Sequence, residues 1–347
     1  LVRFDDFMAT DIPIGLTILT FTSTTPVPVW VREAITSENT KRNNSITTVT
    51  FGTNYGSTGE LPPPSDAPMP IEALLSNAAI TGRTYVPLTQ ILGRGYNATT
   101  DDFAVLLSAV MNDVFAAGLP IVDDVGLALR WATPIICGST FDVDFGKAKI
   151  TKVLSNTSVG NAAIRNTDIE IPMDKFRWIG GTIRELNDTV TGTLMRINAE
   201  EVELSYLDAE FHGGIGVSLN STDDGSIIIT HNKVTSTETE EGSGDACVRI
   251  GGGANIISHS NYYEADEDAH PITTNTSPSG ALPNRNTINM VTTGNVIKTN
   301  GRLVGAVGAS SNPAAANSTH TGLHSNITFE NIRGTCGQFF RLCFDDV

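Results

Sequence analysis

The sequence predicts an all-β solenoid, in which short strands wind in successive coils around one core. Three observations favour this fold. Only 17% of the 347 residues are charged and 32 are glycine, a composition that favours strands and tight turns over helices. One strongly amphipathic helix precedes a long run of strand-like segments. Those segments recur with a shared pattern at intervals of a few tens of residues, which is typical of solenoids.

Residues 1–60 are predicted to form a small β-rich domain. Three runs of alternating apolar residues are separated by turns rich in Thr, Pro and Asn: Ile14–Phe21, Val27–Val31 and Ile46–Phe51. We interpret this domain as an anchor or attachment module, and the alternative is an accessory sugar-binding module. Residues 61–92 are predicted to form a neck or linker. Five prolines within residues 61–72 exclude a regular helix or a central strand there and stiffen the chain.

An amphipathic helix is predicted to follow this neck. Its apolar residues fall on one stripe at helical spacing, from Phe103 to Phe115. Thr99 followed by Asp102 predicts a capping box, and Gly118 supplies the C-terminal stop. A lone helix at this place suits a solenoid, because the open end of its first coil must be sealed from water. The alternative is an ordinary capped helix in an α+β domain.

Strand-like runs recur from Ile121 onward as a degenerate repeat. Six of them are Phe176–Ile183, Val202–Phe211, Ile227–Ser236, Ile256–Ala265, Ile288–Thr299 and Ile327–Gly334. Each coil of a solenoid buries its apolar face only against neighbouring coils, so constant strands with variable loops indicate a β-helix whose turns carry insertions. A Greek-key sandwich would show two-residue hairpin turns, and few such signals occur.

Four asparagines, Asn232, Asn261, Asn295 and Asn331, recur along these runs at strand–turn junctions. Asparagine tolerates a left-handed backbone, and its side chain can hydrogen-bond a neighbouring coil. We therefore expect these residues to occupy equivalent corners. The final run, Phe339–Phe344, still has the pattern of a strand. Without a polar cap, it indicates that more chain follows or that a partner covers the end. Because the sequence opens on Leu1, we interpret it as a fragment or a processed product.

The beginning of the predicted helix resembles a known family. The string Tyr96-Asn97-Ala98-Thr99-Thr100-Asp101-Asp102 is similar to the "GDGTTDDT" that precedes the same kind of helix in pectate-lyase-like right-handed parallel β-helices, a fold common in bacteriophage tailspikes. Ala98 stands where that family has glycine. The resemblance implies that residues 93–347 are a right-handed parallel β-helix body with an N-terminal capping helix, incomplete at its C-terminus.

The same resemblance implies a function. Tailspikes and tail fibres are homotrimers of the virion tail, located outside the host cell, and they bind bacterial surface polysaccharide. Residues 1–60 would then attach to other tail or baseplate proteins. The alternatives are a secreted or virion-associated polysaccharide hydrolase or lyase, and a structural stalk without catalysis.

Charge and cysteine usage exclude several other classes. The 38 acidic against 22 basic residues give a net charge of −16, which disfavours nucleic acid and anionic membranes as partners. No apolar run approaches the ~18 residues of a membrane-spanning helix. The four cysteines, Cys137, Cys247, Cys336 and Cys343, lack metal-ligand spacing and are predicted to be core thiols. We expect no metal and no cofactor.

An acidic cluster between residues 223 and 270 is the candidate site. We expect its carboxylates to occupy corresponding positions on successive coils. Coils stack ~4.8 Å apart, so groups two coils apart lie near the ~6.5–9.5 Å separation of an inverting glycosidase pair, in which one carboxyl protonates the leaving oxygen and the other activates water. The predicted catalytic residues are Asp223, Asp224, Asp245 and His270, and the predicted substrate-binding residues are Glu241, Asp266, Asp268 and Tyr262. The alternative is that these are ordinary solvated turn residues.

The cluster also resembles the polygalacturonase-type β-helix hydrolases, whose motifs are Asn-Thr-Asp, Asp-Asp and Gly-His-Gly. The corresponding segments are Ser221-Thr222-Asp223, Gly244-Asp245-Ala246-Cys247-Val248 and Asp268-Ala269-His270-Pro271. Ala246 replaces the aspartate that supplies the acid in that family, Ser221 replaces the asparagine, and the glycines around His270 are missing. Receptor binding is therefore the leading hypothesis, and hydrolysis is secondary to it.

Overall fold

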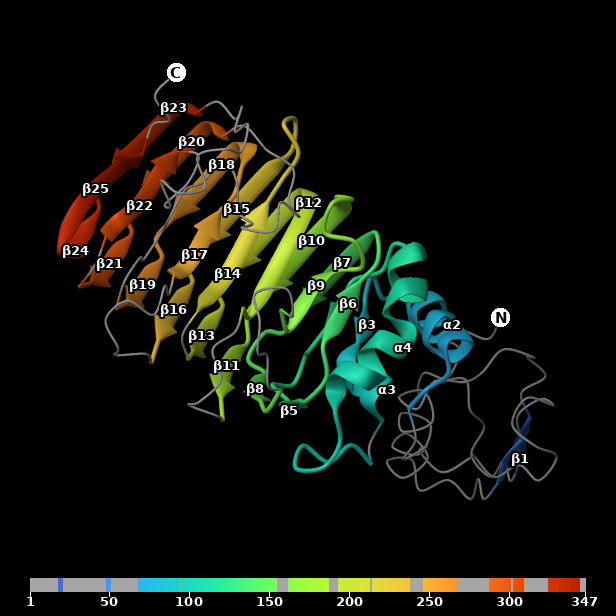
Figure 1. Cartoon of the computed structure of the whole chain (residues 1–347). Coiled ribbons are helices and arrows are strands. Elements are labelled where there is room, and N and C mark those ends of the chain that lie inside the picture. Colours follow the sequence, from blue (N-terminus) through green and yellow to red (C-terminus); the bar gives the residue numbers. More distant parts are fainter. Residues whose placement is uncertain are drawn as a thin grey trace, which may run out of the picture. The chain divides into compact units, whose positions relative to one another are not determined.

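The computed structural model places the protein in two compact units, Leu1–Tyr96 and Asn97–Val347, shown in Figure 1. Each unit is considered separately. The structure describes residues 18–20, 48–50, 68–93, 95–154, 162–186, 193–212, 214–237, 246–266, 287–300, 302–308 and 324–343.

In the described residues of the first unit, one strand pair and two helices are present. Strands β1 (Ile18–Thr20) and β2 (Thr48–Thr50) pair in parallel. Helices α2 (Ile71–Thr81) and α3 (Leu88–Leu92) flank the short strand β3 (Val86–Pro87). The neck expected over residues 61–92 therefore holds two helices. Pro70 at the N-cap of α2 explains why a proline-rich stretch leads into a helix, since its ring presets the backbone angle that a helix start needs.

The second unit begins with the predicted amphipathic helix, α4 (Phe103–Ala116). Phe103, Leu107, Met111 and Val114 are buried along one face, as expected. The predicted capping box is wrong: Asp102 is itself the N-cap and accepts a hydrogen bond from the Ala104 amide at 3.1 Å. Thr99 instead bonds the side chain of Asn97.

After α4 the chain forms strands that pair in three parallel ladders. The first ladder comprises β4 (Ile121–Val122), β7 (Thr140–Asp144), β10 (Met173–Ile179), β12 (Met195–Ser205), β15 (Ser226–Thr230), β18 (Gly253–His259), β20 (Thr287–Thr293) and β23 (His324–Glu330). The second comprises β5 (Ala128–Trp131), β8 (Lys149–Lys152), β11 (Thr182–Glu185), β13 (Asp208–Phe211), β16 (Lys233–Ser236), β19 (Tyr262–Ala265), β21 (Val296–Thr299) and β24 (Arg333–Thr335).

The third ladder comprises β6 (Ile135–Cys137), β9 (Ile164–Asn166), the first residues of β12, β14 (Ile215–Asn220) and β17 (Ala246–Ile250), with a separate pair β22 (Arg302–Gly308) and β25 (Gln338–Cys343). Strand β12 turns a corner: Met195–Asn198 pair with β14, and Glu201–Ser205 pair with β15.

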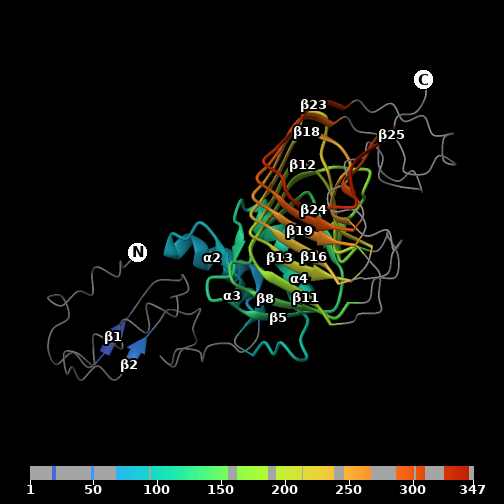
Figure 2. The same ribbon diagram turned by 90° about the vertical axis from the view of Figure 1, so that its left-hand side faces the viewer.

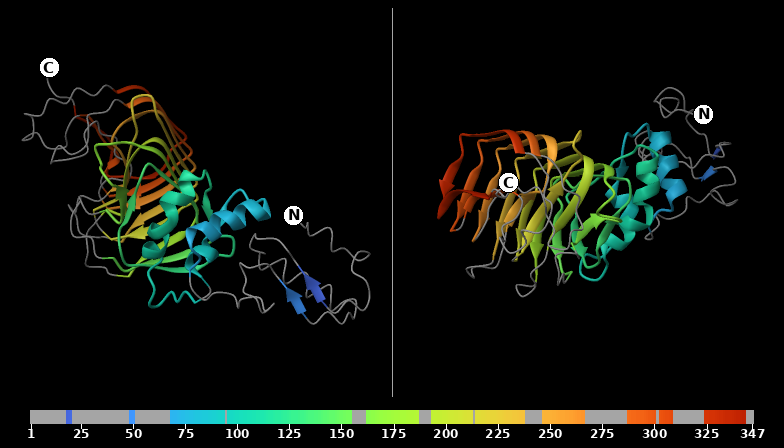
Figure 3. Two further views of the ribbon diagram at one scale, coloured as in Figure 1. Left: turned by 90° about the vertical axis from the view of Figure 1, so that its right-hand side faces the viewer. Right: turned by 45° about the horizontal axis from the view of Figure 1, so that its top comes forward.

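We call one passage of the chain through the first, second and third ladders a lap. The described strands follow this order, and within a ladder each strand lies beside its equivalent from the next lap. Figures 2 and 3 show these successive laps overlying one another. Within the described strands of the second unit every pair is parallel. The structure is mostly β with long parallel sheets, which confirms that part of the sequence prediction.

The core lies between the ladders, and several strands of the first and second ladders, such as β7, β13 and β19, alternate buried and outward side chains. The second ladder, for example, stacks Leu129, Ile150, Ile183, Ala209, Val234, Tyr263 and Ile297 in one inward column. Cys137 and Cys247 are buried free thiols, as predicted, and burial raises the pKa of the Cys137 thiol. Outward side chains at fixed register are therefore the positions from which a site can be built.

Candidate functional site

The structure describes four of the eight predicted site residues. Asp223 and Asp224 are exposed on the connection between β14 and β15. Tyr262 begins β19, and Asp266 directly follows that strand. The other four lie outside the described residues: Glu241, Asp245, Asp268 and His270.

Asp223 and Asp224 are predicted to occupy the same position on their coil as Asp266 does on a later one. This prediction is wrong. The connection of Asp223 leads from the third ladder to the first. Its counterpart one lap later contains Gly252, whose carbonyl accepts the Ser221 amide at 3.0 Å. Asp266 instead follows a strand of the second ladder. Loops of different length interrupt each lap at different corners, so distance along the sequence does not give position around the lap.

The segments that resemble the hydrolase motifs also lie at different places. Ser221 is buried, and its hydroxyl donates to the Glu200 carbonyl at 2.8 Å. Ala246 and Cys247 lie on β17 of the third ladder, and both side chains are buried. Ser221 and Ala246 are therefore used in packing and in a backbone contact, and neither faces a reacting group.

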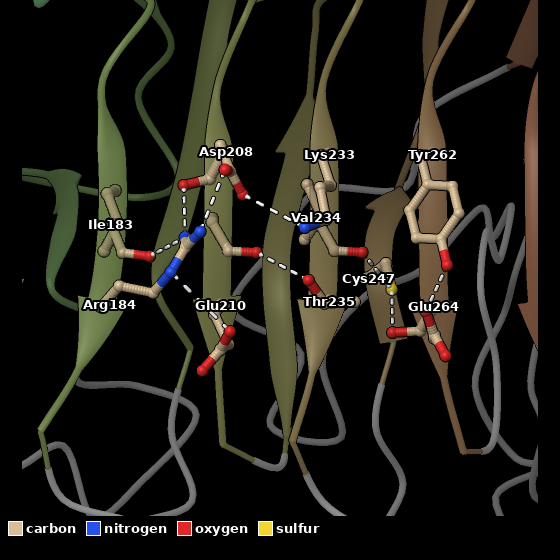
Figure 4. A network of polar contacts seen from close by, with 11 residues as sticks. Ile183, Arg184, Asp208, Glu210, Lys233, Val234, Thr235, Cys247, Tyr262 and Glu264 are labelled. Carbon is tan, nitrogen blue, oxygen red and sulfur yellow. Dashed lines mark hydrogen bonds and ion pairs between the residues drawn. The ribbon is translucent and has the colours of Figure 1, made fainter. Parts of the chain in front are cut away.

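The second ladder brings polar side chains together on its outward face. Two outward columns cross the strands from β11 to β21. One contains Thr182, Asp208, Lys233, Tyr262 and Val296, and the other contains Arg184, Glu210, Thr235, Glu264 and Lys298. We call this surface the second-ladder face, and Figure 4 shows most of it.

A network of ion pairs organises the N-terminal part of the second-ladder face. The Arg184 guanidinium lies 3.0 Å from the Asp208 carboxylate and 3.7 Å from that of Glu210. It also donates to the main-chain carbonyls of Ile183 and Asp208. Lys233 approaches Asp208 at 4.0 Å from the next lap. The Arg184 guanidinium is thus held in place by two carboxylates and two main-chain carbonyls (Figure 4).

The central part of this face is built around Tyr262. Its hydroxyl donates to the Glu264 carboxylate, two residues along the same strand. The Lys298 ammonium, one lap later, lies 5.3 Å from the centroid of the Tyr262 ring, within the range of a cation–π contact. The hydrogen bond with the Tyr262 side chain and the negative charge of Glu264 raise the pKa of Lys298. A cation, an anion and an aromatic ring are therefore presented side by side.

A cleft of about 300 Å³ opens next to this group at the end of β19 and β21. It is lined by Ser236, Glu264, Ala265, Asp266, Lys298, Thr299, Asn300 and Thr335. The Asn300 amide donates to the Asp266 carboxylate at 2.7 Å and so fixes its orientation. The cleft offers carboxylates, an ammonium, an amide and hydroxyl groups, a set that matches the hydroxyl groups of a sugar.

Neither a metal-ligand group nor a membrane-spanning helix occurs among the described residues. Within the described ranges, no three His, Cys, Asp or Glu side chains are grouped so that they could hold a metal ion. None of the helices described is both long enough and apolar enough to span a membrane.

Comparison with protein-family models, with curated proteins and with solved structures finds no match.

Among the residues at this cleft and beside it, the sequence prediction includes Tyr262 and Asp266 but omits Glu264, Lys298 and Asn300. A signal for them was present. Glu264 and Lys298 each follow an asparagine of the repeat, Asn261 and Asn295, by three residues. Aligning the coils on these asparagines places both residues in one outward column.

Proposed function

We propose that residues 97–347 form a right-handed parallel β-helix, capped by α4, that serves as a bacteriophage tailspike or tail-fibre receptor-binding protein. In this proposal the protein is a homotrimer of the virion tail, and its N-terminal region attaches to other tail or baseplate proteins. The second-ladder face binds bacterial surface polysaccharide outside the host cell. The parallel winding that follows the amphipathic helix α4 supports the fold assignment.

The observation that carries the binding role is the cleft beside Tyr262. Each sugar hydroxyl both donates and accepts hydrogen bonds, so it requires acceptors such as Glu264 and Asp266 together with a donor such as Lys298. An aromatic ring adds an apolar face for the C–H groups of the sugar. An open, ladder-shaped surface suits a polymer, because a long chain can cross several laps without entering a closed pocket.

A second candidate function is hydrolysis of the bound polysaccharide. Glu264 and Asp266 line the same cleft. The α-carbons of residues two apart in an extended chain are spaced by roughly 6.6 Å, so two such side chains can reach the ~6.5–9.5 Å carboxyl separation of an inverting pair. In this alternative one carboxyl protonates the leaving oxygen, and the other activates water.

An array of purified bacterial O-antigen and capsular polysaccharides tests the binding role. Glu264→Gln and Lys298→Met should each weaken binding of the recognised polysaccharide about tenfold, since a hydrogen bond to a charged group contributes roughly 1.5–3 kcal/mol. Glu201→Gln makes the same charge change on the outward face of the first ladder and should leave binding unchanged. Unchanged binding in both cleft variants would contradict the proposed site.

The same incubations distinguish the enzymatic alternatives. New reducing ends alone indicate hydrolysis, and reducing ends with the ultraviolet absorbance of unsaturated sugars indicate a lyase. Hydrolysis by the cleft predicts that Asp266→Asn abolishes the release of reducing ends. Binding without either signal leaves a receptor-binding protein.

A further inference from the structure

The corner between the first and second ladders is a column of residues with left-handed backbone. Each of these residues directly follows a strand of the first ladder, and they occupy equivalent positions on successive laps. They are Gly180, Tyr206, His231, Ser260, Gly294 and Asn331, with φ between 51° and 69°. Glycine adopts this conformation freely, whereas other residues lose roughly 1–2 kcal/mol. A bulky tyrosine in this conformation is uncommon, and such strain tends to cluster at functional sites.

Tyr206 and His231 form an exposed aromatic ridge at this corner. Their rings stack with centroids 4.9 Å apart and planes inclined by only 9°. The ring of His259, one lap further, meets His231 edge-on at 5.1 Å. Tyr206 is nevertheless 61% exposed. Because His231 covers one face of the Tyr206 ring, the opposite face is the one that remains open.

The open face of the Tyr206 ring is the one directed toward the preceding lap. At the corner of that lap the equivalent residue is a glycine. Gly180 is the equivalent of Tyr206, and a Cβ there would lie 2.5 Å from the Gly146 carbonyl oxygen. No side chain other than hydrogen fits at this place. The residue equivalent to Tyr206 on the preceding lap therefore has no side chain that could cover the Tyr206 ring.

Charged pairs flank the ridge on both ladders. On the first ladder Arg177 pairs with Glu203 at 3.1 Å, and on the second Arg184 pairs with Asp208 at 3.0 Å. Glu203 and Asp208 lie three residues before and two residues after Tyr206 in the sequence. An aromatic face with hydrogen-bonding groups on either side matches a pyranose, whose ring carries C–H groups on its faces and hydroxyl groups at its rim.

We propose that the open face of Tyr206 is a second sugar-binding subsite, which takes one pyranose ring of the polysaccharide stacked over Gly180. The subsite rests on the proposed function, because the cleft beside Tyr262 supplies the main contacts of the same polymer. The left-handed backbone at Tyr206 places its ring on the exposed corner. A glycine or a buried side chain at this position would offer no surface for a sugar to stack on.

Binding of the polysaccharide selected on the array tests the subsite by calorimetry. Tyr206→Phe should retain binding, and Tyr206→Gly should weaken it about tenfold while leaving the melting temperature unchanged or higher, because glycine relieves the strained φ. A residue with only a structural role would lower the melting temperature when removed. In protein labelled with ¹³C on its tyrosine rings, the Tyr206 signal, assigned by its loss in Tyr206→Phe, should shift on addition of the polysaccharide.

The possible failures are distinguishable. If the polysaccharide binds, Lys298→Met weakens it, and Tyr206→Gly and the Tyr206 ring signal show no effect, the subsite is overturned while the proposed function stands. If no polysaccharide on the array binds, both fall. If Tyr206→Gly changes the mass of the assembly in light scattering and leaves binding intact, the ridge is a subunit contact, and the subsite is again overturned.

Discussion

The early laps of the second unit, β4 to β13, and the late laps, β15 to β24, fill the same core in different ways. Aromatic rings dominate the early laps: Trp178 stacks with Trp131 at 6.2 Å and with Phe141 at 6.0 Å, and it lies 4.3 Å from Phe145. The late laps hold mainly aliphatic side chains, with Ile227, Ile256 and Met290 in one column, and Tyr263 is a buried aromatic ring among them.

The two regions also turn the corner from the first ladder to the second differently. In the early laps the Gly181 amide donates to the Gly146 carbonyl, and the Trp178 indole donates to the Gly180 carbonyl. In the late laps a buried asparagine ladder serves this purpose. Asn232, Asn261 and Asn295 accept the amides of Leu207, Asn232 and Asn261 at 2.8–2.9 Å. The corner thus needs its backbone groups satisfied, and either glycines with an indole or stacked carboxamides meet that need.

The aromatic packing of the early laps should give the largest effect when broken. Trp178 is fully buried against three other rings, so Trp178→Ala should lower the free energy of unfolding by about 3–5 kcal/mol. Urea unfolding followed by circular dichroism measures this. Trp178→Phe keeps most of the ring contacts and should cost less. A loss below about 1 kcal/mol in the alanine variant would show that the early laps do not depend on this stack.

The asparagine ladder of the late laps is the matched target. Asn261→Ala leaves the Asn232 amide and the Ile229 carbonyl buried without this partner. Each such group costs about 1–3 kcal/mol, and we expect a total near 3 kcal/mol in the same urea measurement. Asn289→Gly, at an exposed asparagine with positive φ on the same laps, should have little effect. Equal effects of the two variants would refute the structural role of the ladder.

The sequence predicted this ladder in part. The repeat of asparagines predicts corners, where asparagine either adopts a left-handed backbone or hydrogen-bonds a neighbouring coil. The structure assigns these roles to adjacent positions. Asn295 is the buried hydrogen-bonding residue, whereas Asn331 is equivalent to its predecessor Gly294 and has φ 51°. The recurrence of asparagine in the sequence does not show which of two adjacent corner positions each asparagine occupies, because both positions favour this residue.

The site was predicted less completely than the fold. Strand type follows from local alternation, so the parallel ladders could be inferred from short runs. The position of a side chain around a lap depends on every loop before it, and loops here vary widely in length. Tyr262 lies on a strand within the predicted run Ile256–Ala265, but Asp223 and Asp266 are predicted to share one position and lie at different corners.

Alkaline pH should expose a smaller effect in the late laps. Burial raises the pKa of the Tyr263 hydroxyl above its ordinary value near 10. The unfolded chain therefore loses this proton first, so the stability contributed by the neutral hydroxyl is complete below about pH 10 and declines above it. The decline is about 1.4 kcal/mol per pH unit. Comparing unfolding at pH 9 and pH 11, Tyr263→Phe should lose less stability than the parent protein; equal losses would contradict this.

The smallest effect is expected on the outward face of the early laps. One outward column of the first ladder carries charges there, at Asp142, Arg177 and Glu203, and becomes apolar in the late laps, at Ile228 and Ile257. Burial lowers the pKa of Arg177, but its hydrogen bond and the charges of Asp142 and Glu203 outweigh this and raise it. Even so, the three side chains are partly solvated, and solvent screens such pairs.

Arg177→Met keeps the side-chain length and removes the charge. It should lower the free energy of unfolding by about 1 kcal/mol or less in low salt, and the loss should shrink in 1 M NaCl because salt screens exposed charges over ~3 Å. Ile257→Thr, in the same column of the late laps, provides a control whose cost should not depend on salt. A salt-independent loss for Arg177→Met would mean that its methylene packing, rather than its ion pairs, stabilises the early laps, and that the two halves of the column differ less than their charges indicate.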